Sequence, residues 1–225
     1  MKIDWIKKSR EGIQIKNGLF YIDPIYPVKN AVITHAHADH ARPGHNQIFA
    51  TIETIEIMKE RYGANFCEKF TAYDYNQNFK IQDINLFFAP AGHVLGSAQI
   101  VINYNSQRVT FAGDYKRQHD PTCLPFEPIK SDIFVTEATF GLPVFKHPDA
   151  NDQIDTLIKS IQKFPNRCHI IGVYSLGKAQ RIIKMLRTKG WMDTIYMHGS
   201  LVKICRLYEK FGIDLGRLEP ATVKD

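Results

Sequence analysis

Residues 34–45 read THAHADHARPGH, and this short stretch holds four of the nine histidines in the 225-residue chain. It follows the apolar run AVI, which predicts a buried strand that ends at Thr34. A loop leaving the sheet there would carry the first two histidines, and the aspartate and histidine that follow could turn back toward the same point. Neutral imidazole and carboxylate groups are ligands for zinc, manganese or iron. The stretch therefore predicts a metal site formed by His35, His37, Asp39 and His40.

A second set of polar residues follows apolar runs elsewhere in the chain. Asp23 follows GLFYI, Asp114 follows VTFAG, and Glu137 follows DIFVT. His93 lies in AGHVLGSAQI, where flanking glycines let the backbone approach closely. An aspartate after a strand is by itself usually a turn former. Together with the histidine stretch, these residues predict one shared rim of a sheet sandwich that binds two divalent ions.

The composition indicates a globular protein with a sizeable core. Hydrophobic residues make up 44% of the chain, and no segment is long and apolar enough to span a bilayer. The N-terminal stretch MKIDWIKKSREG is charged and lacks the apolar region of a secretory signal. The four cysteines are widely spaced, which favours buried thiols over a disulfide framework. We therefore expect a cytoplasmic protein with no membrane association.

The chain changes character near residues 146–150. The part before it alternates short apolar runs with turn signals, which predicts strands, with one helix at 51–63 capped by Thr51 or Thr54 and ended by Gly63. The part after it alternates helix and strand patterns, which predicts a parallel α/β unit. We expect domains at 1–147 and 148–225. The predicted strands are 12–17, 18–24, 30–35, 47–51, 84–90, 98–104, 107–114, 132–139, 169–175 and 193–199, and the later helices are 151–165, 176–190 and 200–212.

The basic charge is unevenly distributed. Residues 1–145 carry equal numbers of acidic and basic side chains, so the whole formal net charge of +6 comes from residues 146–225. Such asymmetry favours a polyanion-binding surface on the second part. A solvated basic surface without a partner explains the charge equally well.

The order of these motifs resembles a known family. Asp23, the HxHxDH motif at 35–40, His93 and Asp114 are similar to the motifs of the metallo-β-lactamase fold. TEATFG, which contains Glu137, resembles an acidic motif of the β-CASP nucleases, and GVYSLGKAQR (172–181) resembles a segment of their inserted domain. Together with GDYKRQHDPTCLPFEPI (113–129), these motifs most resemble the bacterial DNA-ligase-associated exonucleases, which are mRNA 3′-end processing factor-like proteins.

The resemblance implies a fold and a set of roles. The expected fold is α/β, an α+β sandwich: an incomplete metallo-β-lactamase αββα fold with an inserted α/β β-CASP-like domain. Two divalent ions, zinc or manganese, would activate water for attack on phosphorus. The implied catalytic residues are Asp39, Asp114 and Glu137, the last acting on a histidine that serves as an acid. The implied ligands are His35, His37 and His93 for one ion, Asp39 and His40 for the other, Asp114 for both, and Asp23 orients a ligating histidine.

One departure from the family affects the expected activity. Members of the family return from the inserted domain and contribute a further histidine ligand, but this sequence stops at LEPATVKD. We therefore expect a C-terminally truncated chain that lacks the returning segment. His198 in YMHGSL resembles a family segment at the same place, and we interpret it as a structural residue.

These inferences lead to one leading function and several alternatives. The resemblance implies a DNA exonuclease in ligase-associated repair or end processing, with DNA as substrate and a DNA ligase and a helicase as partners. The alternatives are an RNA-processing nuclease of the same branch, a catalytically incomplete nucleic-acid-binding fragment, and a hydrolase of small thioesters or lactams. The expected nucleic-acid contacts are Lys178 and Arg181 near a helix N-terminus, where backbone amides also bind phosphate, and Lys116 and Arg117 beside the metal site.

Overall fold

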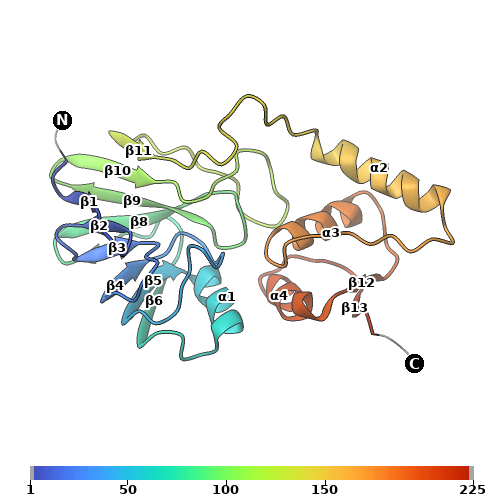
Figure 1. The fold of residues 1–225 in the computed structure, drawn as a ribbon, viewed down its shortest axis with the longest axis horizontal. Helices are drawn as coiled ribbons and strands as arrows, with labels where there is room; N and C mark the ends of the chain where they lie inside the picture. Colours follow the sequence, from blue (N-terminus) through green and yellow to red (C-terminus); the bar gives the residue numbers. More distant parts are fainter. Residues whose placement is uncertain (1–2, 223–225) are drawn as a thin grey trace. The chain divides into compact units, whose positions relative to one another are not determined.

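The structure is a computed structural model that describes residues 3–222. The chain forms two compact units, and the boundary in the sequence lies between Glu137 and Ala138. Each unit is visible in Figure 1, the first in blue to yellow-green and the second in yellow to red. The assignment of domains at 1–147 and 148–225 stays a prediction.

The first part of the chain forms a six-stranded sheet. Its first three strands pair antiparallel, and the following pairs are parallel. The strands, in spatial order, are β1 (Ile6–Lys8), β2 (Ile13–Ile15), β3 (Phe20–Ile22), β4 (Asn30–Val32), β5 (Gln47–Thr51) and β6 (Lys69–Tyr73).

A five-stranded sheet follows. In spatial order it contains β11 (Ile133–Val135), β10 (Gln107–Phe111), β9 (Ala98–Tyr104), β8 (Ile84–Pro90) and β7 (Phe79–Ile81). The alternation of β8 shows why this sequence forms a strand: Ile84, Leu86 and Phe88 are fully buried, whereas Asn85 between them is exposed.

The two sheets pack face to face around one hydrophobic core (Figure 1). The core combines Phe20 and Val32 from the first sheet with Phe88, Ile100 and Phe111 from the second. Burying each large apolar side chain contributes on the order of 2 kcal/mol. These contacts fix the sandwich and therefore the position of its rim.

The strands that precede the predicted site residues end at one rim of the sandwich. β3 and β4 are parallel neighbours, so their carboxyl ends lie together. β8 and β10 both pair antiparallel with β9, and β11 pairs parallel with β10, so these three strands also run in one direction. The two sheets meet at this rim, where the Ala98 N–H at the start of β9 donates to the Thr34 carbonyl at 2.8 Å.

Helix α1 (Ile52–Tyr62) follows β5 directly and confirms the predicted helix. The Thr51 hydroxyl accepts a hydrogen bond from the Thr54 N–H at 3.3 Å, as an N-cap does, and Gly63 ends the helix with a φ of 85°.

The second unit contains three helices and a small parallel sheet within residues 138–222. They are α2 (Ala150–Lys163), α3 (Lys178–Thr188), β12 (Ile195–Met197), α4 (Gly199–Lys210) and β13 (Leu218–Pro220). β12, which falls in the predicted strand 193–199, pairs parallel with β13, which was not predicted. His198, interpreted as structural, accepts a hydrogen bond from the Ser200 N–H at 3.2 Å and caps α4.

One predicted strand is wrong. Residues 169–175, HIIGVYS, form no strand, and Ile170 is 91% exposed. An apolar run becomes a strand only where a neighbour completes its backbone hydrogen bonds. In the described part of this unit, β12 and β13 pair with each other, and the run has no strand beside it.

Candidate metal centre

Four side chains converge at the rim of the sandwich. One ligand atom from each lies within 4.8 Å of those of the other three. His35 Nε2 is 3.0 Å from His37 Nδ1, and His93 Nε2 is 3.2 Å from the same His37 atom. The fourth member, Asp114, follows β10 and places Oδ2 3.6 Å from His93 Nε2. Three imidazoles and one carboxylate therefore point toward one common position.

The other carboxylate oxygen of Asp114 faces a second pair of predicted ligands. Asp114 Oδ1 is 3.4 Å from His40 Nε2, which in turn is 3.8 Å from Asp39 Oδ2. The Asp39 side chain is 76% exposed and forms the open side of this group. Asp114 thus lies between the two groups with one oxygen toward each.

Asp23 supports both the histidine loop and His40. Its backbone adopts a φ of 42°, in the left-handed region that aspartate tolerates better than most residues. In this conformation the carboxylate accepts the Thr34 N–H at 2.8 Å and the Thr34 hydroxyl at 2.6 Å. The same carboxylate is 2.8 Å from His40 Nδ1, so it orients the ring and leaves Nε2 facing Asp114.

A close approach between two loops fixes the position of Asp114. Gly113 has a φ of 57°, and a Cβ atom at this position would lie 2.7 Å from the Thr34 Cβ. Such a distance is a steric clash. The loop after β10 can therefore approach the loop of residues 34–45 this closely only with glycine at position 113.

Helix α1 binds both ligand loops. At its start, the hydroxyls of Thr51 and Thr54 donate to the Gly96 carbonyl at 2.7 and 2.9 Å, in the loop that carries His93. At its end, Arg61 donates to the Ala36 carbonyl, and the Tyr62 hydroxyl donates to the Ala41 carbonyl at 2.9 Å. The contacts of Arg61 and Tyr62 could not be predicted from the sequence, because an arginine in the last turn of a helix is common for electrostatic reasons alone.

The electrostatics keep the imidazoles of His35 and His93 neutral. Burial, followed by the charges of His40, His37 and His93, holds the pKa of His35 well below its usual range. Burial and the neighbouring His37 lower the pKa of His93 to about 4. Neutral imidazole is the form that binds a metal ion. Converging nitrogen and oxygen donors with depressed pKa values therefore fit a divalent cation.

His40 has the opposite environment. Burial lowers its pKa, but hydrogen bonds to Asp114 and Asp23 outweigh this effect and raise the pKa to about 10. The same hydrogen bond from His40 lowers the pKa of the Asp114 carboxyl. A divalent ion held by Asp39, His40 and Asp114 would supply the positive charge that the His40 imidazolium supplies in its absence.

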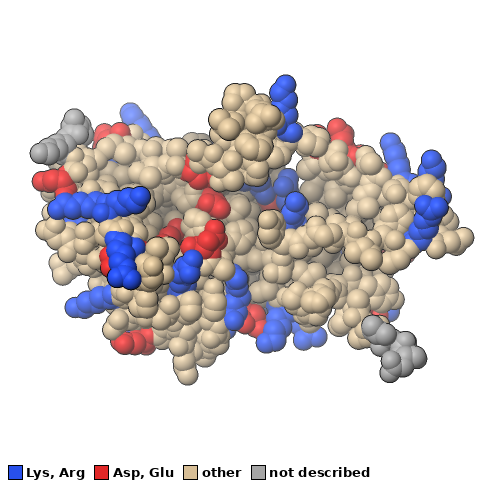
Figure 2. Space-filling model, in the orientation of Figure 1, with Lys and Arg blue, Asp and Glu red and all other residues tan. Residues whose placement is uncertain are grey.

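The remaining predicted site residues lie in different surroundings. Glu137 is half-buried, and its negative charge acts to raise the pKa of His93 against the larger effect of burial, so it lies near the centre. Lys116 is half-buried, and Arg117 beside it is exposed. Lys178 and Arg181 belong to the second unit, in the first turn of α3. Figure 2 shows the basic side chains of that unit scattered over the drawn face, without one dominant patch.

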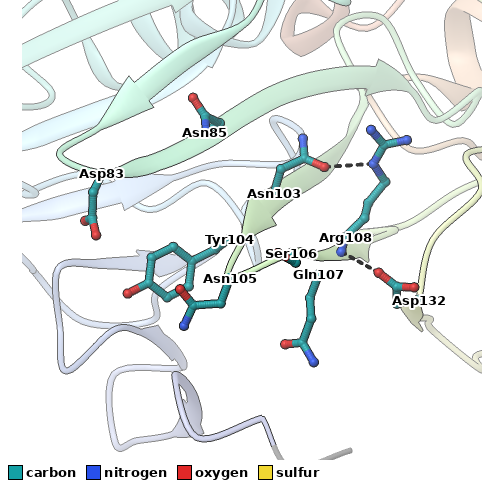
Figure 3. Close-up of a pocket in the computed structure, with 9 residues that line it drawn as sticks. All are labelled: Asp83, Asn85, Asn103, Tyr104, Asn105, Ser106, Gln107, Arg108 and Asp132. Carbon is teal, nitrogen blue, oxygen red and sulfur yellow. Dashed lines mark hydrogen bonds between the residues drawn. The ribbon is translucent and has the colours of Figure 1, made fainter.

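A polar hollow of about 570 Å³ lies at the other end of β9 from the histidines. Its side chains interact with each other: Arg108 Nε donates to Asn103 Oδ1 at 2.8 Å, and the Arg108 N–H donates to Asp132 at 2.7 Å (Figure 3). This hollow is therefore part of the polar surface of the sheet. It is lined by Asp83, Asn85, Asn103, Tyr104, Asn105, Ser106, Gln107, Arg108 and Asp132.

No protein-family model matches the chain. Curated relatives do: a probable DNA ligase of Opitutus terrae is 26% identical over 93% of this chain, and an RNase J-like protein of Methanocaldococcus jannaschii is 26% identical over 82%. An endoribonuclease ysh1 of Aspergillus fumigatus is 35% identical over 50% of this chain. The chain spans 20%, 50% and 13% of the length of these three relatives, respectively.

One solved structure, a protein of unknown function from Enterococcus faecalis, has a TM-score of 0.58 at 16% identity. The match covers 87% of this chain and 52% of that chain, and it supports the fold alone. The curated relatives confirm the resemblance to the β-CASP nucleases of the metallo-β-lactamase fold. None of the helices in residues 3–222 has the length and apolar character needed to cross a membrane.

Proposed function

We propose that this chain carries the catalytic centre of a metal-dependent phosphodiesterase that degrades DNA in ligase-associated repair or end processing. The observation that supports this most strongly is the position of Asp114, whose two oxygens face two separate groups of ligand atoms. Two groups that share one carboxylate fit two divalent ions. Among the described residues, the donors near that carboxylate are nitrogen and oxygen atoms, which suit zinc or manganese.

The protein residues would hold the ions and the substrate in place. His35, His37 and His93 would bind one ion, Asp39 and His40 the other, and Asp114 both. Divalent ions at this rim would supply positive charge to the phosphoryl group and would activate water for attack on phosphorus. Asp23 fixes the tautomer of His40 by accepting from its Nδ1. Glu137 would position or protonate a histidine that serves as acid for the leaving oxygen.

The DNA substrate and the ligase partner are the finer part of this proposal. The relative named as a probable DNA ligase supports them, since its match extends over 93% of this chain. The relatives named as an endoribonuclease and as RNase J-like support the second candidate, an RNA-processing nuclease. In this proposal Lys178 and Arg181 contact phosphates through side-chain charge and the N-terminal amides of α3.

Cleavage of labelled oligonucleotides tests the proposal. The 225-residue chain, supplied with manganese or zinc, is incubated with 5′-labelled single-stranded DNA and matched RNA. We expect a ladder that shortens from the DNA 3′ end, and a loss of at least 100-fold in rate for Asp39→Ala, because one ligand of the second ion is removed. Asp83→Ala is the matched control, since Asp83 pairs with Lys16 on the exposed surface.

Each other result has a definite meaning. Faster cleavage of RNA than of DNA supports the second candidate. Binding of both strands without cleavage identifies a nucleic-acid-binding module that does not act as an enzyme. Turnover of a thioester with no affinity for nucleic acid contradicts the phosphodiesterase.

A further inference from the structure

Lys116 is fixed beside the candidate metal centre by its backbone. It lies in the loop after β10, and its N–H donates to the Ala91 carbonyl at 3.0 Å, just before His93 in the neighbouring loop. A Cβ atom on Gly92 would lie 2.4 Å from the Lys116 carbonyl oxygen, so the two loops are in direct backbone contact. The loop that carries Asp114 therefore places Lys116 next to the loop that carries His93.

The Lys116 side chain is held by a buried carboxylate. Its ammonium group forms an ion pair with Asp120 Oδ2, and the Asp120 side chain is 2% exposed. The other oxygen, Asp120 Oδ1, accepts the Thr122 N–H at 2.9 Å and the Thr122 hydroxyl at 2.6 Å. Thr122 is itself 1% exposed. A carboxylate fixed in this way restricts the ammonium to one position.

The charge of Lys116 acts on the metal centre. The pKa of His93 is lowered mainly by burial and by His37, and the positive charge of Lys116 adds to this lowering. The Lys116 side chain keeps 21% of its surface exposed, so it is not sealed inside the protein. By contrast, the neighbouring Arg117 is exposed.

We propose that Lys116 binds a phosphate oxygen of the nucleic-acid substrate next to the metal centre, and that Asp120 is the positioning residue that holds Lys116 there. This inference rests on the proposed function and adds to it one substrate contact and its support. An ammonium group has three donors, so a lysine that donates to one carboxylate oxygen can also donate to a phosphate. Because Asp120 orders the side chain before the substrate arrives, binding costs less conformational entropy than at a free surface lysine.

Binding and cleavage by matched variants test this inference. A 5′-fluorescent single-stranded DNA is titrated at several salt concentrations by anisotropy, and kcat/KM is measured with manganese. We expect Lys116→Met to lower the affinity about tenfold and to reduce the slope of log K against log salt by about 0.7, the value for one phosphate contact on a single strand. Lys116→Arg keeps most of the affinity, whereas Lys80→Met, an exposed lysine on β7, changes neither quantity.

A double-mutant cycle tests the role of Asp120. Asp120→Asn is expected to weaken binding less than Lys116→Met, and the double variant is expected to bind no more weakly than Lys116→Met alone. Additive losses would mean that Asp120 only stabilises the loop, and they would overturn its positioning role. The metal content of every variant is expected to equal that of the wild type, and a loss of metal from Lys116→Met would overturn the substrate contact.

The same data separate this inference from the proposed function. If the wild type cleaves DNA and Lys116→Met changes neither binding nor kcat/KM, the inference is wrong and the phosphodiesterase stands. If the wild type binds without cleaving and Lys116→Met still loses affinity, the inference stands and the phosphodiesterase fails. If the wild type neither binds nor cleaves, both are wrong.

Discussion

His45 is the histidine of the opening stretch that faces away from the metal centre. It is 1% exposed, and its Nδ1 accepts the Val28 N–H at 3.2 Å, while Nε2 has no hydrogen-bond partner in residues 3–222. Burial lowers its pKa to about 4. The neutral ring is therefore part of the core beneath the loop.

This buried imidazole makes stability depend on pH. The folded state keeps His45 neutral down to about pH 4, whereas the unfolded chain binds the proton near pH 6.5. The contribution of the neutral His45 ring to the free energy of unfolding is therefore complete above pH 6.5. It is lost as the pH falls toward 4, and the total loss is at most about 3 kcal/mol. Urea unfolding at pH 7 and at pH 5 gives the free energy of unfolding of the wild type and of His45→Gln. The difference between the two proteins should change from one pH to the other.

The exposed His119 provides the control for this measurement. His119→Gln should show the same difference from wild type at both pH values. An equal pH effect on wild type and on His45→Gln would contradict the assignment of the effect to His45.

At the scale of single elements, the success of prediction followed the strength of the local signal. The helix α1 and the strands β8 and β9 were predicted because their patterns are long and their ends carry caps or turns. The strands β1 and β6 were missed, since their side chains include exposed lysines and their pairing depends on neighbours far along the chain. Residues 169–175 were wrongly predicted as a strand for a related reason. An apolar pattern in the sequence does not show whether a neighbouring strand is available for pairing.

The same distinction applies to the metal centre. The convergence of His35, His37, His93 and Asp114 at one rim could be predicted because the strands that precede them are apolar runs in the sequence. The support by Thr34 and Arg61 could not be predicted, because it consists of hydrogen bonds between segments far apart in the chain that no local pattern specifies. Side-chain support of this kind becomes visible only when the packing is known.

Helix α1 is hydrogen-bonded to both loops of the candidate metal centre, so we expect it to affect metal affinity. Arg61→Met removes the donor to the Ala36 carbonyl, between His35 and His37, so the loop should lose its fixed geometry. We expect the zinc or manganese affinity to fall by 10- to 100-fold, the range for second-shell changes at metal sites. Isothermal titration of the metal-free protein measures this change directly.

The neighbouring Arg42 provides a matched comparison, since it is exposed on the same loop. Arg42→Met should leave the metal affinity within about twofold of the wild type, because no loop geometry depends on it. A fall for Arg42→Met as large as that for Arg61→Met would show that the loss of charge, and not the loss of the loop contact, is responsible.

At the scale of the whole molecule, the second unit depends on one buried arginine. Arg187 donates to the carbonyls of Trp191, Asp193, Leu215 and Arg217 at distances between 2.7 and 2.9 Å. Burial lowers its pKa. Since Asp193 precedes β12 and Arg217 precedes β13, a single guanidinium group joins the starts of both strands to α3.

Because the units are separately compact, loss of this guanidinium should affect one of them alone. Arg187→Met removes a donor from four carbonyls, of which that of Arg217 keeps the Ile195 N–H at 3.1 Å, and should destabilise the second unit by roughly 3 kcal/mol. Hydrogen exchange measured by mass spectrometry should show faster exchange in α3, α4 and β12 and unchanged exchange in β8–β10. Metal stoichiometry should also stay at the wild-type value.

Thr188→Ala is the control, since Thr188 is exposed on the same helix and its hydroxyl donates within the helix to the Lys184 carbonyl at 3.0 Å. It should leave both exchange patterns unchanged. Faster exchange in both units of Arg187→Met would show that the chain unfolds as a single cooperative unit.

The residues that converge in the candidate metal centre are separated by a large part of the chain. His35 and His37 follow β4 in one sheet, whereas Asp114 follows β10 in the other, so their donor atoms meet only after the two sheets have packed. Such long-range closure is a slow step in folding. A nascent chain that exposes residues 34–45 before residue 114 is synthesised offers a partial ligand set, and an ion bound to that set also stabilises the unfolded chain. The affinity of the unfolded chain for such an ion therefore decides how much of the binding energy of the ion contributes to the stability of the folded sandwich.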